Sequence, residues 1–271
     1  MKNIELLIIK PLILLLVFVL IGCSGSDTPN TNETKKLQKN KQKTEKQKSV
    51  KKKQFAKKKF VRLSNDNLVK ELTAYGNANK ESLILMKTPK GNMKIKLYEN
   101  TPLHRANIIR LIKNNFYKGT MFYRVVDDFM IQGGDSDDWE RKSIKDKMGR
   151  YTIPAEFRAG NIHKKGALAM AREYKNNPEK RSVPFEFFIV QGTKYNDAQL
   201  RGAEIEYGLK ISPEHQELYK NPGGCPHLDG QHTVFGQVVE GLEVIDAIAA
   251  VKTDEGDWPI ENITIGFEII E

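Results

Sequence analysis

Cysteine is scarce in this sequence, and its scarcity limits what can stabilise the fold. Only Cys23 and Cys225 occur among 271 residues. They could form one disulfide at most, and none at all if Cys23 is modified. Stability must therefore come from a hydrophobic core, and a hydrophobic content of 39% is enough for one sizeable core or two small ones.

The motifs of several enzyme classes are also missing. Gly133-Gly134 is not a phosphate-binding loop and is better interpreted as the end of a strand. Ser143 and Ser182 lie in no nucleophile-elbow motif. No recognised zinc spacing occurs among the five histidines, at 104, 163, 215, 227 and 232. We therefore expect no metal and no cofactor, and neither hydrolase nor nucleotide chemistry.

The main apolar run, PLILLLVFVLIG, is too short to span a bilayer comfortably, since a transmembrane helix needs about 20 apolar residues. It follows Lys2 and Lys10 and suits the hydrophobic region of a signal peptide over residues 1–22. Leu20-Ile21-Gly22-Cys23 resembles a bacterial lipobox, in which the cysteine becomes lipidated. The alternative is an uncleaved N-terminal anchor. Either interpretation attaches the protein to a membrane, with its bulk outside the cytoplasm.

Acidic residues are nearly absent from one segment. Residues 35–59 hold thirteen lysines and one glutamate, so the net charge of +10 comes from this segment, and the chain from Phe60 onward is close to neutral. We expect an extended, disordered tether over 23–59. It is either a solvated spacer or a segment that binds anionic surfaces through Lys35 to Lys59. It lacks interleaved aromatic residues, and we expect no nucleic acid partner.

Three segments have helical patterns. Residues 64–76 have a capping serine, leucines four apart and a final glycine, and they predict a short helix in an appendage over 60–81. Thr101-Pro102 supplies an N-cap and a first-turn proline for a second helix, which ends at Asn114. Residues 241–251 predict a third helix, and the last two helices are expected to cover the core.

Eight short segments have strand character. In residues 93–98, Met93, Ile95 and Leu97 alternate with polar residues, the period-two pattern of a half-buried strand. The other strand segments are 83–87, 120–126, 129–134, 166–171, 185–192, 233–239 and 263–270. Many short strands with only two core helices predict a closed antiparallel barrel rather than a parallel α/β sheet.

Two polar residues interrupt an otherwise apolar stretch, FYRVVDDFMIQGGD. Arg124 and Gln132 are eight residues apart, so they would share one face of a continuous strand. A turn at Val126-Asp127-Asp128 would also bring them together. Phe129 and Met130 lie between them. The pattern therefore indicates a cationic donor and a polar neighbour beside two large apolar groups.

This stretch resembles the signature of the cyclophilin-type peptidyl-prolyl isomerases. The likeness continues through GALAMA (166–171), FFI (187–189) and LDGQHTVFGQVVEGLEVIDAIA (228–249), and it covers roughly residues 82–271 in a consistent order. The resemblance implies a closed eight-stranded antiparallel β-barrel capped by two helices. It also implies an enzyme that catalyses rotation about X-Pro bonds without a cofactor or a covalent intermediate.

By this resemblance, Arg124 matches the family's catalytic arginine and Gln132 the glutamine that supports it. The residues at the family's substrate-binding positions are Phe129, Met130, Ala171, Glu186, Phe188, His227, Leu228 and His232. Without Arg124 nearby, the aromatic members of this set would be interpreted as core. An arginine suits the reaction because it stays charged and carries several donors in one plane, so one donor can reach the substrate while another is held.

The sequence departs from the family pattern at several positions. Glu186 replaces the glutamine that commonly precedes the Phe-Phe-Ile strand, which removes a donor and adds a charge. His227 replaces a common tryptophan, and Arg172 a common asparagine. These changes put the substrate preference in doubt more than the reaction. Residues 192–226 form a longer connection than a compact cyclophilin has, and residues 211–220 within it predict a short helix.

More than one function is compatible with these observations. The first hypothesis is a lipid-anchored, monomeric isomerase that assists the folding of cell-envelope proteins by acting on their proline-containing segments. The second is a proline-peptide binding module or chaperone, in which the change at Phe185-Glu186 has weakened catalysis. A third makes the lysine-rich tether the functional part and the barrel a carrier.

Overall fold

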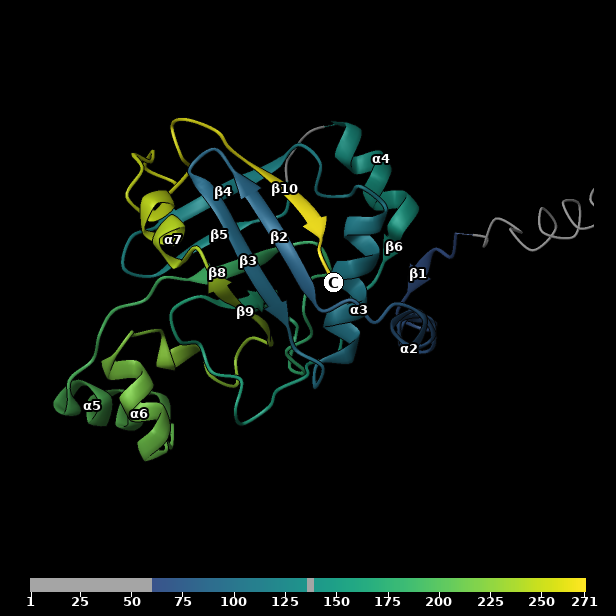
Figure 1. Ribbon diagram of the computed structural model, residues 1–271. Helices are drawn as coiled ribbons and strands as arrows, with labels where there is room; N and C mark the ends of the chain where they lie inside the picture. The colour runs from purple at the N-terminus through teal and green to yellow at the C-terminus, as the bar shows by residue number, and fades with distance from the viewer. Residues whose placement is uncertain (1–59, 136–138) are drawn as a thin grey trace, which may run out of the picture. The chain divides into compact units, whose positions relative to one another are not determined.

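The computed structural model describes residues 60–135 and 139–271 (Figure 1). Phe60–Glu271 forms one compact unit. The predicted signal peptide, the lipidation site at Cys23 and the lysine-rich tether lie outside the described residues. Within 60–135 and 139–271, no helix has the length and apolar character needed to cross a membrane.

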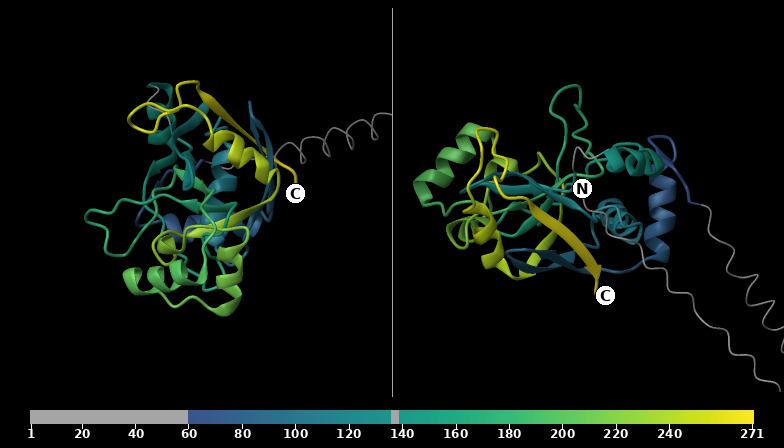
Figure 2. Two further views of the ribbon diagram at one scale, coloured as in Figure 1. Left: turned by 90° about the vertical axis from the view of Figure 1, so that its left-hand side faces the viewer. Right: turned by 90° about the horizontal axis from the view of Figure 1, so that it is seen from above.

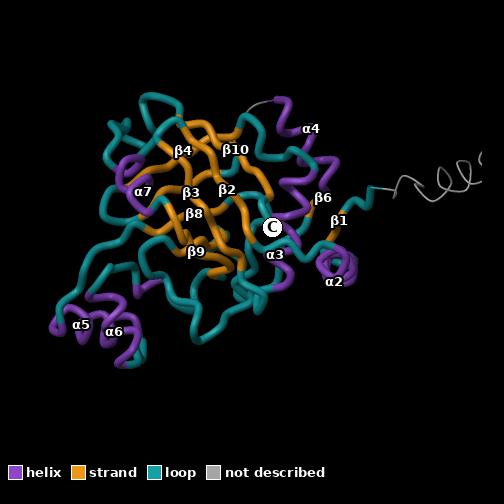
Figure 3. The backbone as a smooth tube through the Cα atoms, viewed as in Figure 1, coloured by secondary structure: helices purple, strands orange, loops and turns teal. Residues whose placement is uncertain are grey.

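Eight strands form the centre of this unit. Their bounds are β2 (Leu83–Thr88), β3 (Gly91–Leu97), β4 (Thr120–Val126), β5 (Met130–Gly133), β7 (Ala167–Met170), β8 (Phe187–Val190), β9 (Val234–Glu240) and β10 (Ile263–Ile269). They make a closed barrel in the order β10-β2-β3-β9-β7-β8-β5-β4, and all the pairings are antiparallel (Figure 3). Each predicted strand segment overlaps one of these strands, so the predicted barrel is confirmed.

Alternation along the strands separates two cores. On β8, Phe187 and Ile189 belong to the main core inside the barrel, whereas Phe188 and Val190 belong to a second cluster. Successive side chains of a strand point to opposite faces, so this second cluster lies on the outer face of the sheet. Met130 and Leu228 are also part of it. The outer cluster is the apolar base of the site described below.

Two helices cover the ends of the barrel, as predicted. Figure 1 shows α3 (Pro102–Lys113) at one end and α7 (Leu242–Ala249) at the other. The Thr101 side chain does not cap α3, which corrects the predicted N-cap. Its hydroxyl donates to the carbonyl of Tyr98 at 3.3 Å, and the carboxylate of Glu156 accepts from the first backbone N–H groups of the helix instead.

The N-terminal helix, α2 (Leu68–Ala78), differs from its prediction at both ends. Ser64 lies in a short strand, β1 (Leu63–Ser64), which pairs with β6 (Gly149–Arg150), and so does not cap the helix. Gly76 does not stop α2, because it lies inside it where a Cβ would be 3.1 Å from the Cβ of Ala106 on α3. Its small size permits close helix packing. Leu68 and Leu72 are fully buried and belong to the same core cluster as residues of α3, so α2 packs on the main domain through α3.

The connection between β8 and β9 contains two helices, α5 (Asp197–Tyr207) and α6 (Pro213–Lys220). The predicted helix within 211–220 is confirmed as α6, capped by Ser212. Helix α5 was not predicted, although Asn196 and Gln199 form a capping box at its start. Figure 2 shows the pair as an outgrowth of the barrel. It has a small core of its own, formed by Ile162, Leu200, Ile211 and Tyr219. A further helix, α4 (Trp139–Met148), was not predicted.

Candidate functional site

Strand register places the predicted site residues in one row. Arg124 on β4 pairs with Gln132 on β5, Gln132 pairs with Phe188 on β8, and Phe188 pairs with Ala169 on β7. The turn between β4 and β5 brings Arg124 and Gln132 together, as one of the two predicted arrangements requires. Asp128 in this turn has a φ of 60°, a left-handed conformation that aspartate tolerates better than most residues. The row crosses four strands on the outer face of the barrel.

A cleft of about 390 Å³ lies over this row. It is lined by Arg124, Phe129, Met130, Gln132, Ala171, Arg172, Tyr174, Phe188, Leu228 and His232. The base is apolar and close-packed, because Met130, Phe188 and Leu228 all belong to the outer cluster. The polar side chains stand around that base. Such a cleft suits a small apolar ring whose attached backbone is polar.

Arg124 is held by a residue that the sequence analysis missed. Its Nε donates to Oδ2 of Asp257 at 3.3 Å, and both side chains are a little over 40% exposed. Its two terminal nitrogens have no partner among the described residues, so they are available to a bound molecule. No side-chain hydrogen bond joins Arg124 and Gln132 in the described part of the chain, although their backbones pair across β4 and β5. The predicted support by Gln132 is therefore not made directly.

The Gln132 amide belongs to a different network. Its Nε2 donates to the Tyr123 hydroxyl at 2.5 Å, and that hydroxyl donates to Oε2 of Glu186 at 2.8 Å. Burial raises the pKa of Glu186, and the neighbouring Asp135 carboxylate adds to the effect. Burial and the Glu186 carboxylate likewise raise the pKa of Tyr123. Glu186 therefore lies behind the cleft wall and reaches the cleft only through Tyr123 and Gln132.

His232 is neutral in the cleft and has a defined tautomer. Its Nδ1 donates to the carbonyl of Met170 at 3.1 Å, so its Nε2 accepts from the Tyr174 hydroxyl at 2.8 Å. Burial lowers the pKa of His232 to about 4. The Arg172 guanidinium stacks 4.0 Å from the Tyr174 ring centroid and donates to the carbonyl of Gln231 at 2.7 Å. Tyr174, missed by the sequence analysis, thus completes this wall.

A set of hydrogen-bonded polar side chains packs against Phe188 at the base of the cleft. Asp229 accepts from Nδ1 of His163 at 2.8 Å and from the Tyr219 hydroxyl of α6 at 2.5 Å. The His163 ring stacks on Phe188 with 6.0 Å between centroids. Cys225 is buried in the outer cluster, and burial raises the pKa of its thiol to about 12. The long connection is therefore tied to the base of the cleft and is not a detached loop.

Eight of the ten predicted catalytic and substrate-binding residues line the cleft. The two that do not are Glu186, placed behind the wall as described, and His227, whose ring stacks on Phe129 with 5.6 Å between centroids. Both are departures from the family pattern. Asp257, Tyr123 and Tyr174 join the site from loops and a neighbouring strand position, and no motif in the sequence marks them.

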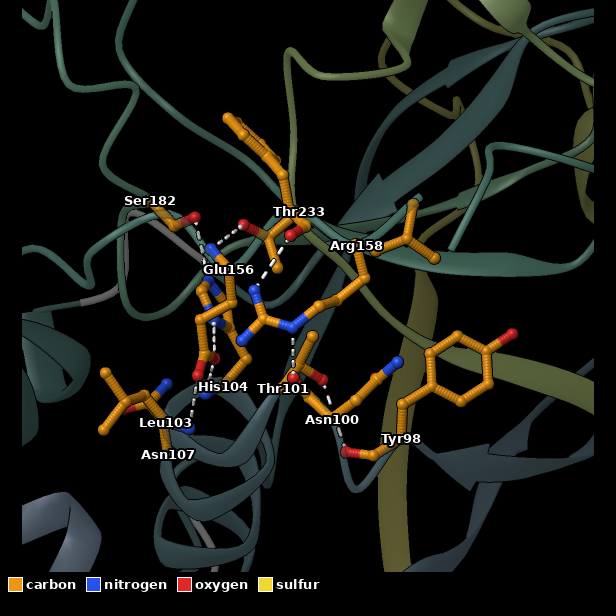
Figure 4. Close-up of polar contacts among 12 residues, drawn as sticks. Tyr98, Asn100, Thr101, Leu103, His104, Asn107, Glu156, Arg158, Ser182 and Thr233 are labelled. Carbon is orange, nitrogen blue, oxygen red and sulfur yellow. Dashed lines mark hydrogen bonds and ion pairs between the residues drawn. The ribbon is translucent and has the colours of Figure 1, made fainter. Parts of the chain in front are cut away.

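A second polar cluster has the residue types of a hydrolase but not the exposure. Nδ1 of His104 lies 2.7 Å from the Glu156 carboxylate, and its Nε2 lies 3.0 Å from the Ser182 hydroxyl (Figure 4). Ser182 is 1% exposed and His104 fully buried. No substrate can reach this serine. Glu156 instead accepts hydrogen bonds from the first backbone N–H groups of α3. These bonds and the one to His104 lower the pKa of Glu156, against the opposing effect of burial.

Fold and cleft together define a class of protein. A closed antiparallel barrel whose apolar cleft is lined by two arginines and several uncharged polar groups suits a protein that binds a peptide segment and acts through hydrogen bonds and charge. No group of three or more His, Cys, Asp or Glu side chains within 60–135 and 139–271 is placed to hold a metal ion.

Comparisons with known proteins agree. The family model of the cyclophilin type peptidyl-prolyl cis-trans isomerases matches residues 83–267. A Staphylococcus saprophyticus protein named "Putative peptidyl-prolyl cis-trans isomerase" is 36% identical over 204 residues, which are 72% of this chain and 94% of that protein. A Staphylococcus aureus protein of the same name is 33% identical, over 68% of this chain and 89% of its own.

A crystal structure of a Cryptosporidium parvum cyclophilin superposes with a TM-score of 0.50 at 21% identity, covering 70% of this chain and 98% of that one. This likeness supports the fold. The chain belongs to the cyclophilin family, and it is a peptidyl-prolyl cis-trans isomerase that acts on proline-containing peptides.

Proposed function

We propose that this isomerase acts on proline-containing segments of cell-envelope proteins, outside the cytoplasm, with Arg124 as its electrostatic catalyst. The observation that carries the assignment is the placement of Arg124. Its Nε is held by Asp257, while its terminal nitrogens remain available beside the apolar cleft. One end of the guanidinium is thus fixed and the other can act on a substrate.

Rotation about an X-Pro bond explains why such an arrangement suffices. Amide resonance opposes the rotation with a barrier of about 18–20 kcal/mol. Halfway round, resonance is lost and the proline nitrogen can accept a hydrogen bond. A donor aimed at that nitrogen stabilises the transition state more than the planar ground state. Phe129, Met130 and Phe188 would hold the proline ring and exclude water, which strengthens the electrostatic contact.

The catalytic assignment is tested by NMR exchange spectroscopy on a short X-Pro peptide, using residues 60–271. Arg124→Ala should lower the exchange enhancement about a hundredfold or more, because it removes a transition-state donor. Arg124→Lys keeps the charge but loses the planar donor set, and it should stay well below wild type. An Arg124→Ala protein with wild-type exchange would contradict the assignment. Peptide binding without enhancement by the wild type would favour a binding module.

The location rests on the N-terminal sequence. Leu20-Ile21-Gly22-Cys23 supports lipidation at Cys23, and residues 35–59 would then space the barrel from the membrane. Incorporation of radiolabelled fatty acid into the full chain, compared with Cys23→Ser, tests this proposal. The Cys23→Ser variant should lose both the label and membrane association. Equal membrane retention with no label in either protein would favour the uncleaved anchor.

A further inference from the structure

Three rings from three segments form a continuous aromatic surface at one edge of the cleft. Phe129 follows β4, His227 lies in the 3-10 helix η1 (Pro226–Leu228), and Tyr207 is the last residue of α5. The Phe129 and His227 centroids are 5.6 Å apart at an interplanar angle of 26°. The His227 and Tyr207 centroids are also 5.6 Å apart, at 42°. The surface therefore continues from a cleft-lining residue onto the long connection.

The outer part of this surface is open to solvent. Tyr207 is 49% exposed, and His227 is only partly buried. The buried residues of α5 are Leu200 and Ala203, and Leu200 belongs to the small core. Tyr207 is thus not required to hold α5 in place. A tyrosine ring that contacts a tilted neighbouring ring and is half exposed leaves apolar area for a ligand.

The middle ring carries no charge at neutral pH. Burial lowers the pKa of His227, and the nearby His163 lowers it further, against the opposing influence of Asp229 and Glu206. A neutral imidazole between two other rings costs little to cover with an apolar group. An uncharged apolar side chain can therefore cover this ring without desolvating a charge on it.

We propose that Tyr207 and His227 form a subsite beside the proline pocket that takes a large apolar or aromatic side chain flanking the substrate's proline. The proposal rests on the proposed function, since it extends the same cleft. The occupant follows from continuity: a peptide with its proline over Phe129 places a neighbouring side chain within reach of the adjoining rings. The long connection then contributes to substrate preference, although it lies outside the barrel.

A peptide series tests the subsite with the full chain purified in detergent. The parent is Ala-Ala-Ala-Pro-Ala-Ala, and in each of four further peptides one phenylalanine occupies one of the two positions before or after the proline. Chemical shift titration gives the Kd, and exchange spectroscopy gives the rate. We expect one phenylalanine position to tighten binding about three- to tenfold, the effect of one aromatic contact.

The variants separate this subsite from the proline pocket. Tyr207→Ala should reduce the phenylalanine preference to less than about twofold while leaving the alanine peptide's Kd and exchange unchanged. Tyr207→Phe keeps the ring and should keep the preference. Ile205→Ala is the matched control, because Ile205 is an 86% exposed apolar residue of the same helix. A preference that survives Tyr207→Ala, or that Ile205→Ala removes equally, would overturn the proposal.

Failure of the proposed function gives a different result. Binding preferences are measured as Kd values and do not require catalysis. A wild-type protein that binds the phenylalanine peptide preferentially without enhancing exchange would retain the subsite and reject the isomerase mechanism. Exchange enhancement without preference for any phenylalanine position would retain the isomerase mechanism and reject the subsite.

Discussion

Arg124 is oriented by Asp257 and not by Gln132, its cross-strand neighbour. The Arg124 Nε donates to Asp257 Oδ2 at 3.3 Å, and the backbone N–H of Val125 donates to the carbonyl of Asp257 at 2.8 Å. Asp257 has a φ of 63°, in the left-handed region. The loop between α7 and β10 is thus fixed to β4 through both the side chain and the backbone carbonyl of Asp257. The position of the guanidinium depends on a residue far away in the sequence.

Asp257→Asn should therefore lower kcat about three- to tenfold and leave KM almost unchanged, the pattern of a lost transition-state interaction. Asparagine tolerates the left-handed backbone, so the change mainly removes the charge. Because both side chains are partly exposed, the free energy of unfolding should change by less than about 1 kcal/mol. Exchange rates at several peptide concentrations and a urea titration measure these quantities. A wild-type kcat would show that Asp257 does not position the guanidinium.

The buried cluster of Ser182, His104 and Glu156 has a structural role. Ser182→Ala should leave isomerase activity unchanged and lower the free energy of unfolding by about 1–2 kcal/mol, because it removes a buried hydrogen-bond partner of His104. Urea unfolding and peptide exchange on the same samples check both statements. Ser212→Ala on α6 is a useful comparison, since it removes an exposed cap far from this cluster. Loss of activity without loss of stability would give Ser182 a role that its burial does not explain.

The barrel was predictable because its strands alternate locally, and the cleft because its residues fall in ordered motifs. The features that could not be predicted from the sequence depend on contacts between segments that are distant along the chain. Thr101 looked like an N-cap, but Glu156 reaches the same N–H groups from another part of the chain. Gly76 was predicted to end the helix, but it lies inside α2, where its lack of a side chain lets the helix pack closely against Ala106. Asp257 and Tyr174 carry no local pattern, because their roles arise only when the barrel closes.

His232 should make stability depend on pH. Its pKa is about 4 in the folded protein and about 6.5 when unfolded, so below pH 6.5 the unfolded state binds a proton that the folded state does not. The stabilisation is complete above pH 6.5 and is lost as pH falls toward 4. Between pH 7 and 5 this amounts to about 2 kcal/mol.

His232→Gln should remove that loss, so the variant's free energy of unfolding should fall by about 2 kcal/mol less than that of the wild type over the same range. Urea titrations at pH 7 and 5 measure it, with His215→Gln on α6 as the control. Glu156 has a lowered pKa and contributes mainly below this window. Parallel pH dependence in wild type and His232→Gln would show that another group carries the effect.

Glu186 should make stability depend on pH in the opposite direction to His232, so that its contribution to stability falls as pH rises. Because burial raises the pKa of its carboxyl, the folded protein holds this proton more tightly than the unfolded chain does. The resulting stabilisation is complete below about pH 4.5 and is lost as pH rises through the folded-state pKa. Ionised Glu186 accepts a hydrogen bond from Tyr123, which only partly offsets the cost of burying its charge.

Glu186→Gln removes the charge and should gain stability relative to the wild type as pH rises from 4.5 to 8. The difference in free energy of unfolding between variant and wild type, from urea titrations at these two pH values, is the measurement. Glu261→Gln changes an exposed carboxylate and is the matched control. A constant difference for Glu186→Gln would mean that the Tyr123 hydroxyl compensates the buried charge fully, and the substitution of glutamate for glutamine would then cost this cyclophilin nothing in stability.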